Sequence, residues 1–401
     1  MITGKRIAMI EDVKAGDILR ADISTVAFGG DGIARIGNLV AFVPFSVDGD
    51  VVDVTVREVK KNFIRCEVKE IIEPSPQRTA YSCRYYALCG GCQYQHIAYD
   101  HQLTIKEAQV RESFQRIGKM ADPPLRSIIP SPAPYHYRGK AEFHCDPRQG
   151  KIGFMDVTGG TLVDIADCPL MDESINEELE TLRSTMHAND APPLRERRCI
   201  LWSGTPYRAA KYIMRLVMDQ DFRIPYTGFF QANGPLTGSL VEQVLSLTEP
   251  STSDVILDCY CGSGLFSLFL APHVREVFGI EIDRGAVDCA RHNFKYHGYT
   301  NGRFFRGSIV DVIDRGFVRD HVRVDTVLLD PPREGCPRKV LDRISRLHPS
   351  RIIYVSCNPA TQARDIAYLS EQGFPLKALQ PIDMFPQTKH IEVIACMERQ
   401  G

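Results

Sequence analysis

Three cysteines near residue 90 are spaced closely enough to bind one metal centre. Cys83, Cys89 and Cys92 stand in CRYYALCGGCQYQH, separated by five residues and then by two. Thiolates hold iron–sulfur clusters, and the two glycines between the last pair allow the thiols to converge. Cys168 is the best candidate for a fourth ligand, because a proline follows it and proline is common after cluster ligands. Zinc also binds four thiolates, so the spacing leaves the metal open.

Another cysteine, Cys357, follows a predicted buried strand in IIYVSCNPA. A cysteine in such a place usually belongs to the core, but beside a methyl donor it could be a nucleophile. Carbon-5 of uracil is too weak a nucleophile to take a methyl group until a thiolate adds to carbon-6. A base must then remove the carbon-5 proton, and the candidates in DMFPQTKHIE are Glu392, His390 and Asp383.

The C-terminal part of the chain has the rhythm of an α/β fold. From about residue 254, five apolar strand candidates (VILDCYC, VFGIEI, GRFFRGS, VDTVLLD and RIIYVSC) alternate with segments of helical length such as 284–297 and 338–347. This alternation predicts a doubly wound parallel sheet that is buried on both faces. FPLKALQPI and HIEVIACMER stand too close together for a helix between them, so they predict an antiparallel hairpin at one edge.

Ligands of doubly wound sheets bind beyond the carboxyl ends of the strands, where this sequence has turns and acidic residues. The first strand runs into a tight CGSG turn, the second ends at Glu281, whose carboxylate could hold ribose hydroxyls, and the fourth ends at Asp330 in a DPPR turn. A dinucleotide-binding fold is the rival interpretation, but Ser267 stands where its fingerprint has a third glycine. The acidic second strand and the DPP turn together resemble the class I S-adenosylmethionine-dependent methyltransferases.

The rest of the chain divides into three stretches. Residues 9–71 hold short β-type runs broken by glycine turns, which predicts a small β-barrel. A linker at 73–76 and an amphipathic helix at 98–117 follow. Residues 122–228 are mixed and rich in turns, and their pattern does not settle a topology.

Composition places the chain among globular proteins. It has 401 residues, of which 44% are hydrophobic and 24% charged, and thirteen cysteines, an odd number that speaks against a disulfide framework. The net charge of −2 requires any affinity for nucleic acid to come from local patches. No apolar run approaches the roughly 20 residues that span a bilayer, and no signal peptide is recognisable. We therefore expect a cytoplasmic protein with no membrane partner and no obligate protein partner.

Five motifs occur along the chain in this order: CGGCQ, GFFQAN, DPPR, SCNPAT and D-x-F-P-x-T-x-H-x-E. Through these motifs the sequence resembles the RNA (uracil-5)-methyltransferases with an iron–sulfur cluster. The resemblance covers nearly the whole chain. It implies an α/β class I methyltransferase fold with an N-terminal OB-like barrel, the TRAM domain, and a mixed central domain. The implied ranges are 9–71 for the TRAM domain, 72–97 and 122–228 for the central domain, and 98–121 and 229–401 for the catalytic domain.

The resemblance also implies roles for single residues. It makes Cys357 the nucleophile and Glu392 the base. It implies a 4Fe–4S cluster held by Cys83, Cys89, Cys92 and Cys168. It places the contacts with S-adenosylmethionine at Gln231, Tyr260, Glu281, Ser308 and Asp330. Two positions depart from the family: Leu265 and Ser308 stand where some relatives carry asparagine.

The implied substrate is a uridine in structured RNA, with 23S ribosomal RNA favoured and the T-loop of transfer RNA second. Its base must leave the stack to be methylated, so cationic grooves with stacking aromatics are expected. Segments 195–215 and 135–140 mix such side chains, and each could equally be a solvated face. A different class of function is an inactive iron–sulfur protein that binds RNA. A DNA or small-molecule methyltransferase is a third possibility, which the TRAM-like barrel disfavours.

Overall fold

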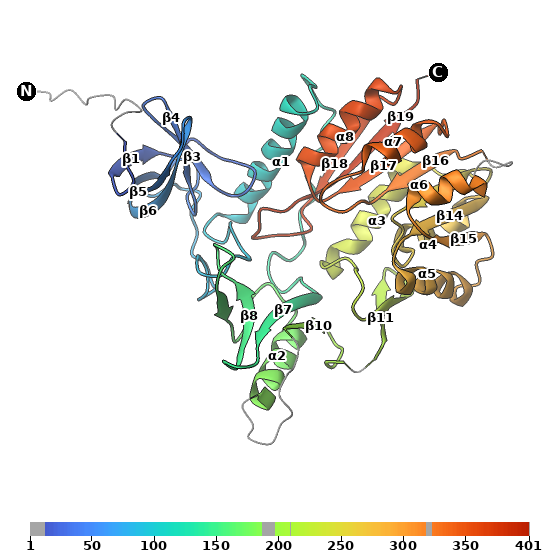
Figure 1. Ribbon diagram of the computed structural model, residues 1–401, viewed down its shortest axis with the longest axis horizontal. Coiled ribbons are helices and arrows are strands. Elements are labelled where there is room, and N and C mark those ends of the chain that lie inside the picture. The colour runs from blue at the N-terminus through green and yellow to red at the C-terminus, as the bar shows by residue number, and fades with distance from the viewer. Residues whose placement is uncertain (1–12, 187–196, 209, 318–322, 401) are drawn as a thin grey trace, which may run out of the picture.

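The computed structural model describes residues 13–186, 197–208, 210–317 and 323–400. The predicted outer boundaries at residues 9 and 401, and Arg195 of the predicted RNA-binding segment, lie outside these ranges. Figure 1 shows an N-terminal group of strands on one side and a large α/β unit on the other. A long helix, α1, stands between them, and a smaller mixed unit lies below. The division into domains at the residues given above stays a prediction.

The N-terminal strands form one six-stranded sheet in the order β1-β5-β6-β4-β3-β2. Along β5 every second side chain, from Val52 to Val56, is buried, as expected for a strand with one face on a core. Although β1 and β3 are not neighbours in the sheet, they contact each other, so the sheet curls around its own core. The strands are β1 (Ile18–Asp22), β2 (Thr25–Val26), β3 (Gly32–Ile36), β4 (Leu39–Val43), β5 (Val51–Val59) and β6 (Phe63–Glu73).

The mixed unit contains a four-stranded sheet in the order β10-β7-β8-β9 and a separate two-stranded hairpin, β11-β12. Helix α2 (Glu173–Met186) packs on β10, and its Ile175 and Leu179 share a core with Phe143 of β7. The strands are β7 (Lys140–Asp146), β8 (Lys151–Met155), β9 (Leu162–Asp164), β10 (Arg198–Trp202), β11 (Tyr212–Val217) and β12 (Gln220–Pro225).

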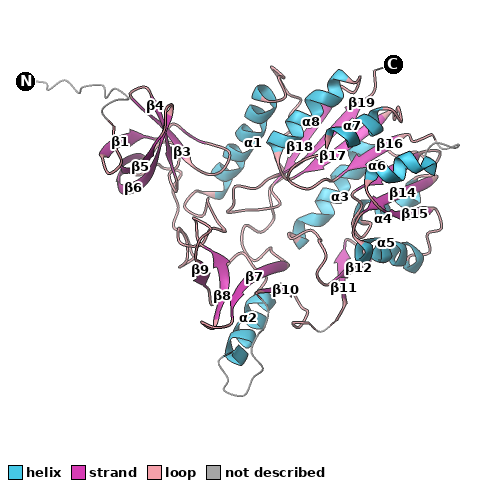
Figure 2. Ribbon diagram, viewed as in Figure 1, coloured by secondary structure: helices cyan, strands magenta, loops and turns pink. Residues whose placement is uncertain are grey.

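The α/β unit is built on a seven-stranded sheet in the order β15-β14-β13-β16-β17-β19-β18. The first five of these strands are parallel, whereas β19 is antiparallel to both β17 and β18. The predicted parallel strands and the edge hairpin are therefore both present (Figure 2). The strands are β13 (Val255–Cys259), β14 (Glu276–Glu281), β15 (Gly302–Arg306), β16 (Thr326–Leu329), β17 (Arg351–Ser356), β18 (Leu376–Ile382) and β19 (Glu392–Glu398).

Helices cover both faces of this sheet, which explains why its central strands β13, β16 and β17 are buried along nearly their whole length. One face packs against α3, α4 and α5, and the other against α7, α8 and the helix α1, whose Val110 and Phe114 enter that core. The helices are α1 (Tyr99–Arg116), α3 (Gly234–Thr248), α4 (Leu265–Leu270), α5 (Arg284–Tyr296), α6 (Ile309–Val312), α7 (Arg338–Ser345) and α8 (Pro359–Glu371). Within the described ranges, no helix has the length and apolar character needed to cross a membrane.

Candidate active site

The turn after β13 is held closed by the carboxylate at the end of β14. Tyr260, Gly262 and Gly264 all have positive φ angles, which makes the turn tight. The Gly262 amide donates to Oε2 of Glu281 at 3.1 Å, and the Asp283 amide donates to Oε1 at 2.8 Å. In a dinucleotide-binding fold, amides of such a turn face a pyrophosphate. In this protein the Gly262 amide instead donates to the Glu281 carboxylate, which disfavours an anionic ligand at this turn.

Two further carboxyl groups lie beside this turn. Burial, together with the negative charge of Glu281, raises the pKa of Asp258 to about 7. Asp258 accepts a 2.5 Å hydrogen bond from the Ser267 hydroxyl, at the position where the dinucleotide fingerprint has glycine. Burial also raises the pKa of Asp330 to about 7, with the charges of Asp258 and Glu281 adding to the shift. A cation placed among these carboxyl groups would relieve their mutual repulsion.

Cys357 lies between the end of β17 and the start of α8. Asn358 caps α8 by accepting a hydrogen bond from the Ala360 amide at 3.1 Å, and Pro359 fits the first helical turn. Cys357 is therefore the residue that directly precedes the cap of α8, at the positive end of the helix dipole. Burial raises the thiol's pKa to about 11, the charge of Glu392 adds to this, and the charge of Arg333 opposes it.

Glu392 is the first residue of β19, and it is only 5% exposed. Its backbone pairs with Ile382 of β18, while the next residue, Val393, pairs with Ser356 of β17, so Glu392 is placed at the strand end that leads into Cys357. Burial and the charge of Asp330 raise the pKa of Glu392 well above its usual range, and Arg333 opposes the rise. The structure thus brings a thiol, a carboxyl group of high pKa and Asp330 together.

The two other candidate bases are less suited to proton abstraction. Burial and the nearby charge of Arg333 lower the pKa of His390 to about 3, which leaves a neutral and weakly basic imidazole. Arg333 donates to this ring, with 3.3 Å between Nη2 and Nε2. Asp383 is fully buried and accepts a 2.6 Å hydrogen bond from the Lys106 ammonium of α1. Its charge is therefore already compensated within the fold.

The remaining predicted cofactor contacts lie on loops around the sheet. Tyr260 follows β13, and burial raises the pKa of its phenol, which is hydrogen-bonded to Cys336. Gln231 is nine-tenths buried in the segment before α3. Ser308 lies just beyond β15, and its hydroxyl caps α6 by accepting from the Asp311 amide at 3.2 Å. This capping role by itself explains a serine at position 308.

The four predicted ligand thiols surround one cavity of about 360 Å³. Three of them come from the turns between residues 83 and 92, and Cys168 comes from the loop after β9. The cysteine turns are tied to the end of β8, because the Gly90 amide donates to the Met155 carbonyl at 2.9 Å. A side chain at position 90 would collide with the Asp156 carbonyl, since a Cβ atom there would lie 2.8 Å from its oxygen.

The surroundings of these four thiols disfavour their ionised, thiolate forms unless a positive charge lies nearby. Burial raises the pKa of Cys92 to about 12 and that of Cys168 to about 11, and the other cysteines of the set add to both shifts. A cationic centre in the cavity would reverse this balance by stabilising the thiolate forms. Among the described residues, however, no three His, Cys, Asp or Glu side chains are arranged to hold a single metal ion.

Arg333 is a residue of the site that the sequence interpretation did not single out. Its side chain donates to His390, and its charge opposes the rise in the pKa values of Cys357 and Glu392. Its backbone carbonyl accepts from the side chains of Asn358 and Thr361, so the DPPR turn is fastened to the start of α8. The only sequence signal was its place in that turn.

Some predicted RNA-stacking aromatics are in fact core residues. Trp202 is 1% exposed, and its indole donates to the Tyr226 carbonyl at 2.7 Å. Tyr137 is 2% exposed, and its hydroxyl donates to the Pro386 carbonyl at 3.0 Å. For Trp202 the mixture of aromatic and cationic residues was misleading, because it also occurs in half-buried strands such as β10, whereas Tyr137 lies in the segment before β7. These two rings are not available to stack on a base.

Comparison with protein families gives two matches. Residues 12–69 match the TRAM domain, and residues 214–400 match the family described as tRNA (Uracil-5-)-methyltransferase. The second match contains Cys357, Glu392 and the carboxyl groups at the strand ends.

Relatives that match nearly the whole chain are also described as RNA methyltransferases. An RNA methyltransferase of Halalkalibacterium halodurans, described as uncharacterized, is 30% identical over 96% of this chain and 98% of its own length. One from Bacillus cereus is 30% identical over 98% of both. Among solved structures, the Pyrococcus abyssi tRNA (uracil-54, C5)-methyltransferase in complex with S-adenosyl-L-homocysteine has a TM-score of 0.71 and 25% identity. That match covers 94% of this chain and 100% of the other.

Proposed function

Because this chain belongs to the tRNA (uracil-5-)-methyltransferase family of RNA methyltransferases, we propose that it methylates carbon-5 of a uridine in structured RNA, with S-adenosylmethionine as methyl donor. The observation that carries this proposal is the pairing of Cys357 with Glu392 beside Asp330. A nucleophilic thiol and a carboxylate base are the two groups that this methylation needs from the protein.

The carboxyl groups beside the pair suit S-adenosylmethionine. Its sulfonium and ammonium groups are cations, and Asp258 and Asp330 have pKa values raised to about 7 because burial and neighbouring negative charges disfavour their ionised forms. Glu281 is held at the end of β14, where it could accept hydrogen bonds from the ribose. Tyr260, Gln231 and Ser308 complete the proposed set of contacts.

The proposed reaction begins when the Cys357 thiol gives its proton to solvent and the resulting thiolate attacks carbon-6 of the uracil. The carbon-5–carbon-6 double bond becomes an enolate, and carbon-5 of this enolate takes the methyl group, which S-adenosylmethionine supplies from its sulfonium. Glu392 then removes the proton from carbon-5. The double bond re-forms and the sulfur–carbon-6 bond breaks, which releases Cys357 and the methylated base. The positive charge of Arg333 stabilises the thiolate in the first and last steps.

For the substrate we propose 23S ribosomal RNA, with the T-loop of transfer RNA as the second candidate. The Pyrococcus abyssi enzyme, whose substrate is a transfer RNA, supports the second. The test is to incubate the purified protein and S-adenosylmethionine with 23S RNA and with transfer RNA, each transcribed without modifications. Mass spectrometry of the nucleosides should find 5-methyluridine in the ribosomal RNA. Methylation of the transfer RNA alone would replace the first substrate by the second.

We propose that Cys83, Cys89, Cys92 and Cys168 hold a 4Fe–4S cluster, because their four thiols line one cavity. Zinc also binds four thiolates and is the alternative occupant of this cavity. We expect protein purified without oxygen to be brown and to contain iron and sulfide in equal amounts. Elemental analysis and a sulfide assay check this. Stoichiometric zinc without sulfide would contradict the cluster.

Removal of the Glu281 carboxylate should weaken binding of the methyl donor. Hydrogen bonds to a charged group contribute about 1.5–3 kcal/mol each. In Glu281→Ala we therefore expect the Kd for S-adenosylmethionine to rise by at least about tenfold in calorimetry. Glu276→Ala is the matched control, because Glu276 begins the same strand and pairs with Arg303. Equal affinities in the two variants would remove Glu281 from the site.

A further inference from the structure

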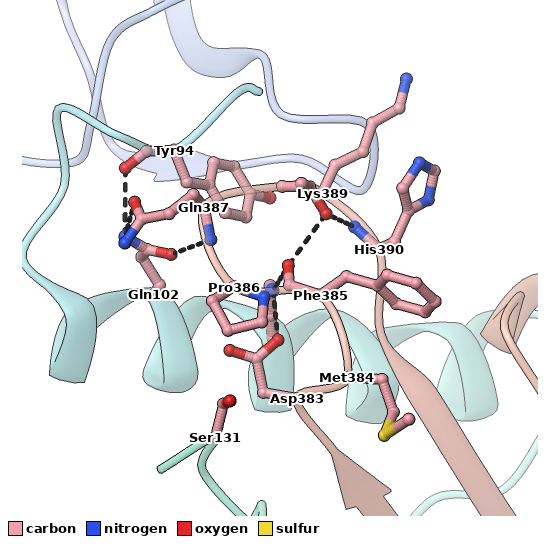
Figure 3. A network of polar contacts seen from close by, with 12 residues as sticks. Tyr94, Gln102, Ser131, Asp383, Met384, Phe385, Pro386, Gln387, Lys389 and His390 are labelled. Carbon is pink, nitrogen blue, oxygen red and sulfur yellow. Dashed lines mark hydrogen bonds and ion pairs between the residues drawn. The ribbon is translucent and has the colours of Figure 1, made fainter. Parts of the chain in front are cut away.

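The loop of residues 383–391 joins β18 to β19 and leads directly into Glu392. It contains no regular secondary structure, and Gln387 at its tip has a φ of +67°, a conformation that non-glycine residues seldom adopt. A loop of this kind keeps one conformation only when its surroundings fix it. Figure 3 shows that neighbouring segments hold it through polar contacts.

Helix α1 holds the loop from one side. Lys106 pairs with Asp383 at 2.6 Å and donates to the Phe385 carbonyl at 3.0 Å, and both charged side chains are fully buried. Gln102 makes two reciprocal bonds with Gln387: its Nε2 donates to the Gln387 Oε1 at 2.9 Å, and its Oε1 accepts from the Gln387 amide at 3.0 Å. These contacts fix the beginning and the tip of the loop.

The cysteine-bearing turns hold it from the other side. The amides of Gln93 and Tyr94 both donate to the Gln387 carbonyl, at 3.2 and 3.0 Å. The Gln93 side chain makes two further bonds: its Oε1 accepts from the Lys389 amide at 3.2 Å, and its Nε2 donates to the Gly90 carbonyl at 3.0 Å. One side chain thus connects the turn between Cys89 and Cys92 to the part of the loop nearest Glu392.

We propose that Gln93 is a positioning residue, whose side chain ties the cysteine-bearing turn to the loop that carries Glu392 and so sets the place of that carboxylate. Lys389, which Gln93 holds, lies three residues before Glu392. This proposal rests on the proposed function, since it assigns Glu392 the proton transfer. It also gives the cysteine turns a part in catalysis without any redox step.

The two halves of the reaction should depend on Gln93 to different degrees. Cys357 follows β17 and is positioned by the cap of α8, neither of which touches Gln93 through the hydrogen bonds described above. Its attack on carbon-6 should therefore survive the loss of Gln93. Proton removal by Glu392 requires close approach to carbon-5, and a displacement of about 1 Å can slow such a step about 100-fold.

The experiment compares Gln93→Met, which fills the same space without hydrogen bonds, with Gln93→Glu, which keeps an acceptor for the Lys389 amide. In Gln93→Met we expect kcat to fall between about tenfold and 100-fold with little change in KM for RNA. Covalent RNA adduct should accumulate on denaturing gels. Hydrogen exchange in the peptide covering 383–391 should accelerate, while iron and sulfide contents stay at the wild-type level. Gln93→Glu keeps the acceptor for the Lys389 amide but loses the donor to the Gly90 carbonyl, so it should recover only part of the turnover and part of the protection of the peptide.

Gln115→Met is the matched control, because Gln115 is an exposed glutamine of α1 that donates to the Ala121 carbonyl. It should behave as wild type in every measurement. The proposal is wrong if Gln93→Met keeps normal kcat and normal exchange. It is also wrong if the variant loses iron, because Gln93 would then maintain the cysteine centre rather than the loop. Wild-type protein that forms no 5-methyluridine would instead refute the proposed function.

Discussion

Cys357→Ala is expected to abolish both methyl transfer and covalent attachment of RNA. Without the thiolate nothing adds to carbon-6, so carbon-5 never becomes nucleophilic and the methyl donor is not consumed. S-adenosylmethionine should still bind, because none of its proposed contacts involves Cys357. Incorporation of labelled methyl groups into RNA, a denaturing gel and calorimetry with S-adenosylmethionine check the three expectations.

The control is Cys289→Ala, which removes another cysteine of the same unit, on α5. It should keep activity. In the wild type, the rate of adduct formation should rise with pH toward the thiol's pKa, which burial raises to about 11, because only the thiolate attacks. Methylation by Cys357→Ala at the wild-type rate would contradict covalent catalysis by this residue.

Glu392→Gln is expected to methylate once and then stop. The amide fills the same space but cannot take a proton, so the methylated adduct should remain bound to Cys357. Loss of a positioned base costs about 10²–10⁴-fold in rate, and turnover should fall by that amount. A denaturing gel should show RNA that migrates with the protein, and mass spectrometry should find the transferred methyl group in the complex.

Glu398→Gln serves as control, since Glu398 ends the same strand and pairs with Arg351. The gel should show no accumulated adduct for it. If Glu392→Gln turned over normally and trapped nothing, another group would have to be the base. His390 is a poor substitute because burial and Arg333 lower its pKa to about 3. Asp383 is engaged with Lys106.

The strand ends were predictable because their signals are local. An apolar strand followed by a glycine turn or an acidic residue marks the edge of a parallel sheet, and Asp330 and Cys357 were placed at that edge from such patterns. The four cysteines followed from short spacing and a proline, and the structure arranges them around one cavity. Their ligand roles, like those of the cofactor contacts, remain predictions.

The contacts between distant segments were not predictable in the same way. Lys106 and Asp383 are separated by 277 positions, and nothing in the pattern of α1 marks Lys106 as a buried cation. Arg333 looked like an ordinary turn residue, although its side chain reaches Cys357. For Trp202 the error was the reverse: the ring was a candidate for stacking on RNA, but it is buried in the core. A single sequence does not reveal which face of a strand is covered.

The most direct test of the central claim uses RNA in which 5-fluorouridine replaces uridine. Fluorine at carbon-5 cannot leave as a cation, so a base cannot complete the elimination after the methyl group has been transferred. We predict that wild-type protein with S-adenosylmethionine and this RNA forms a stable complex, with the mass of protein, RNA and one methyl group, linked through the peptide containing Cys357. Normal methylation of unmodified RNA without such a complex, or a link through another residue, would contradict the account.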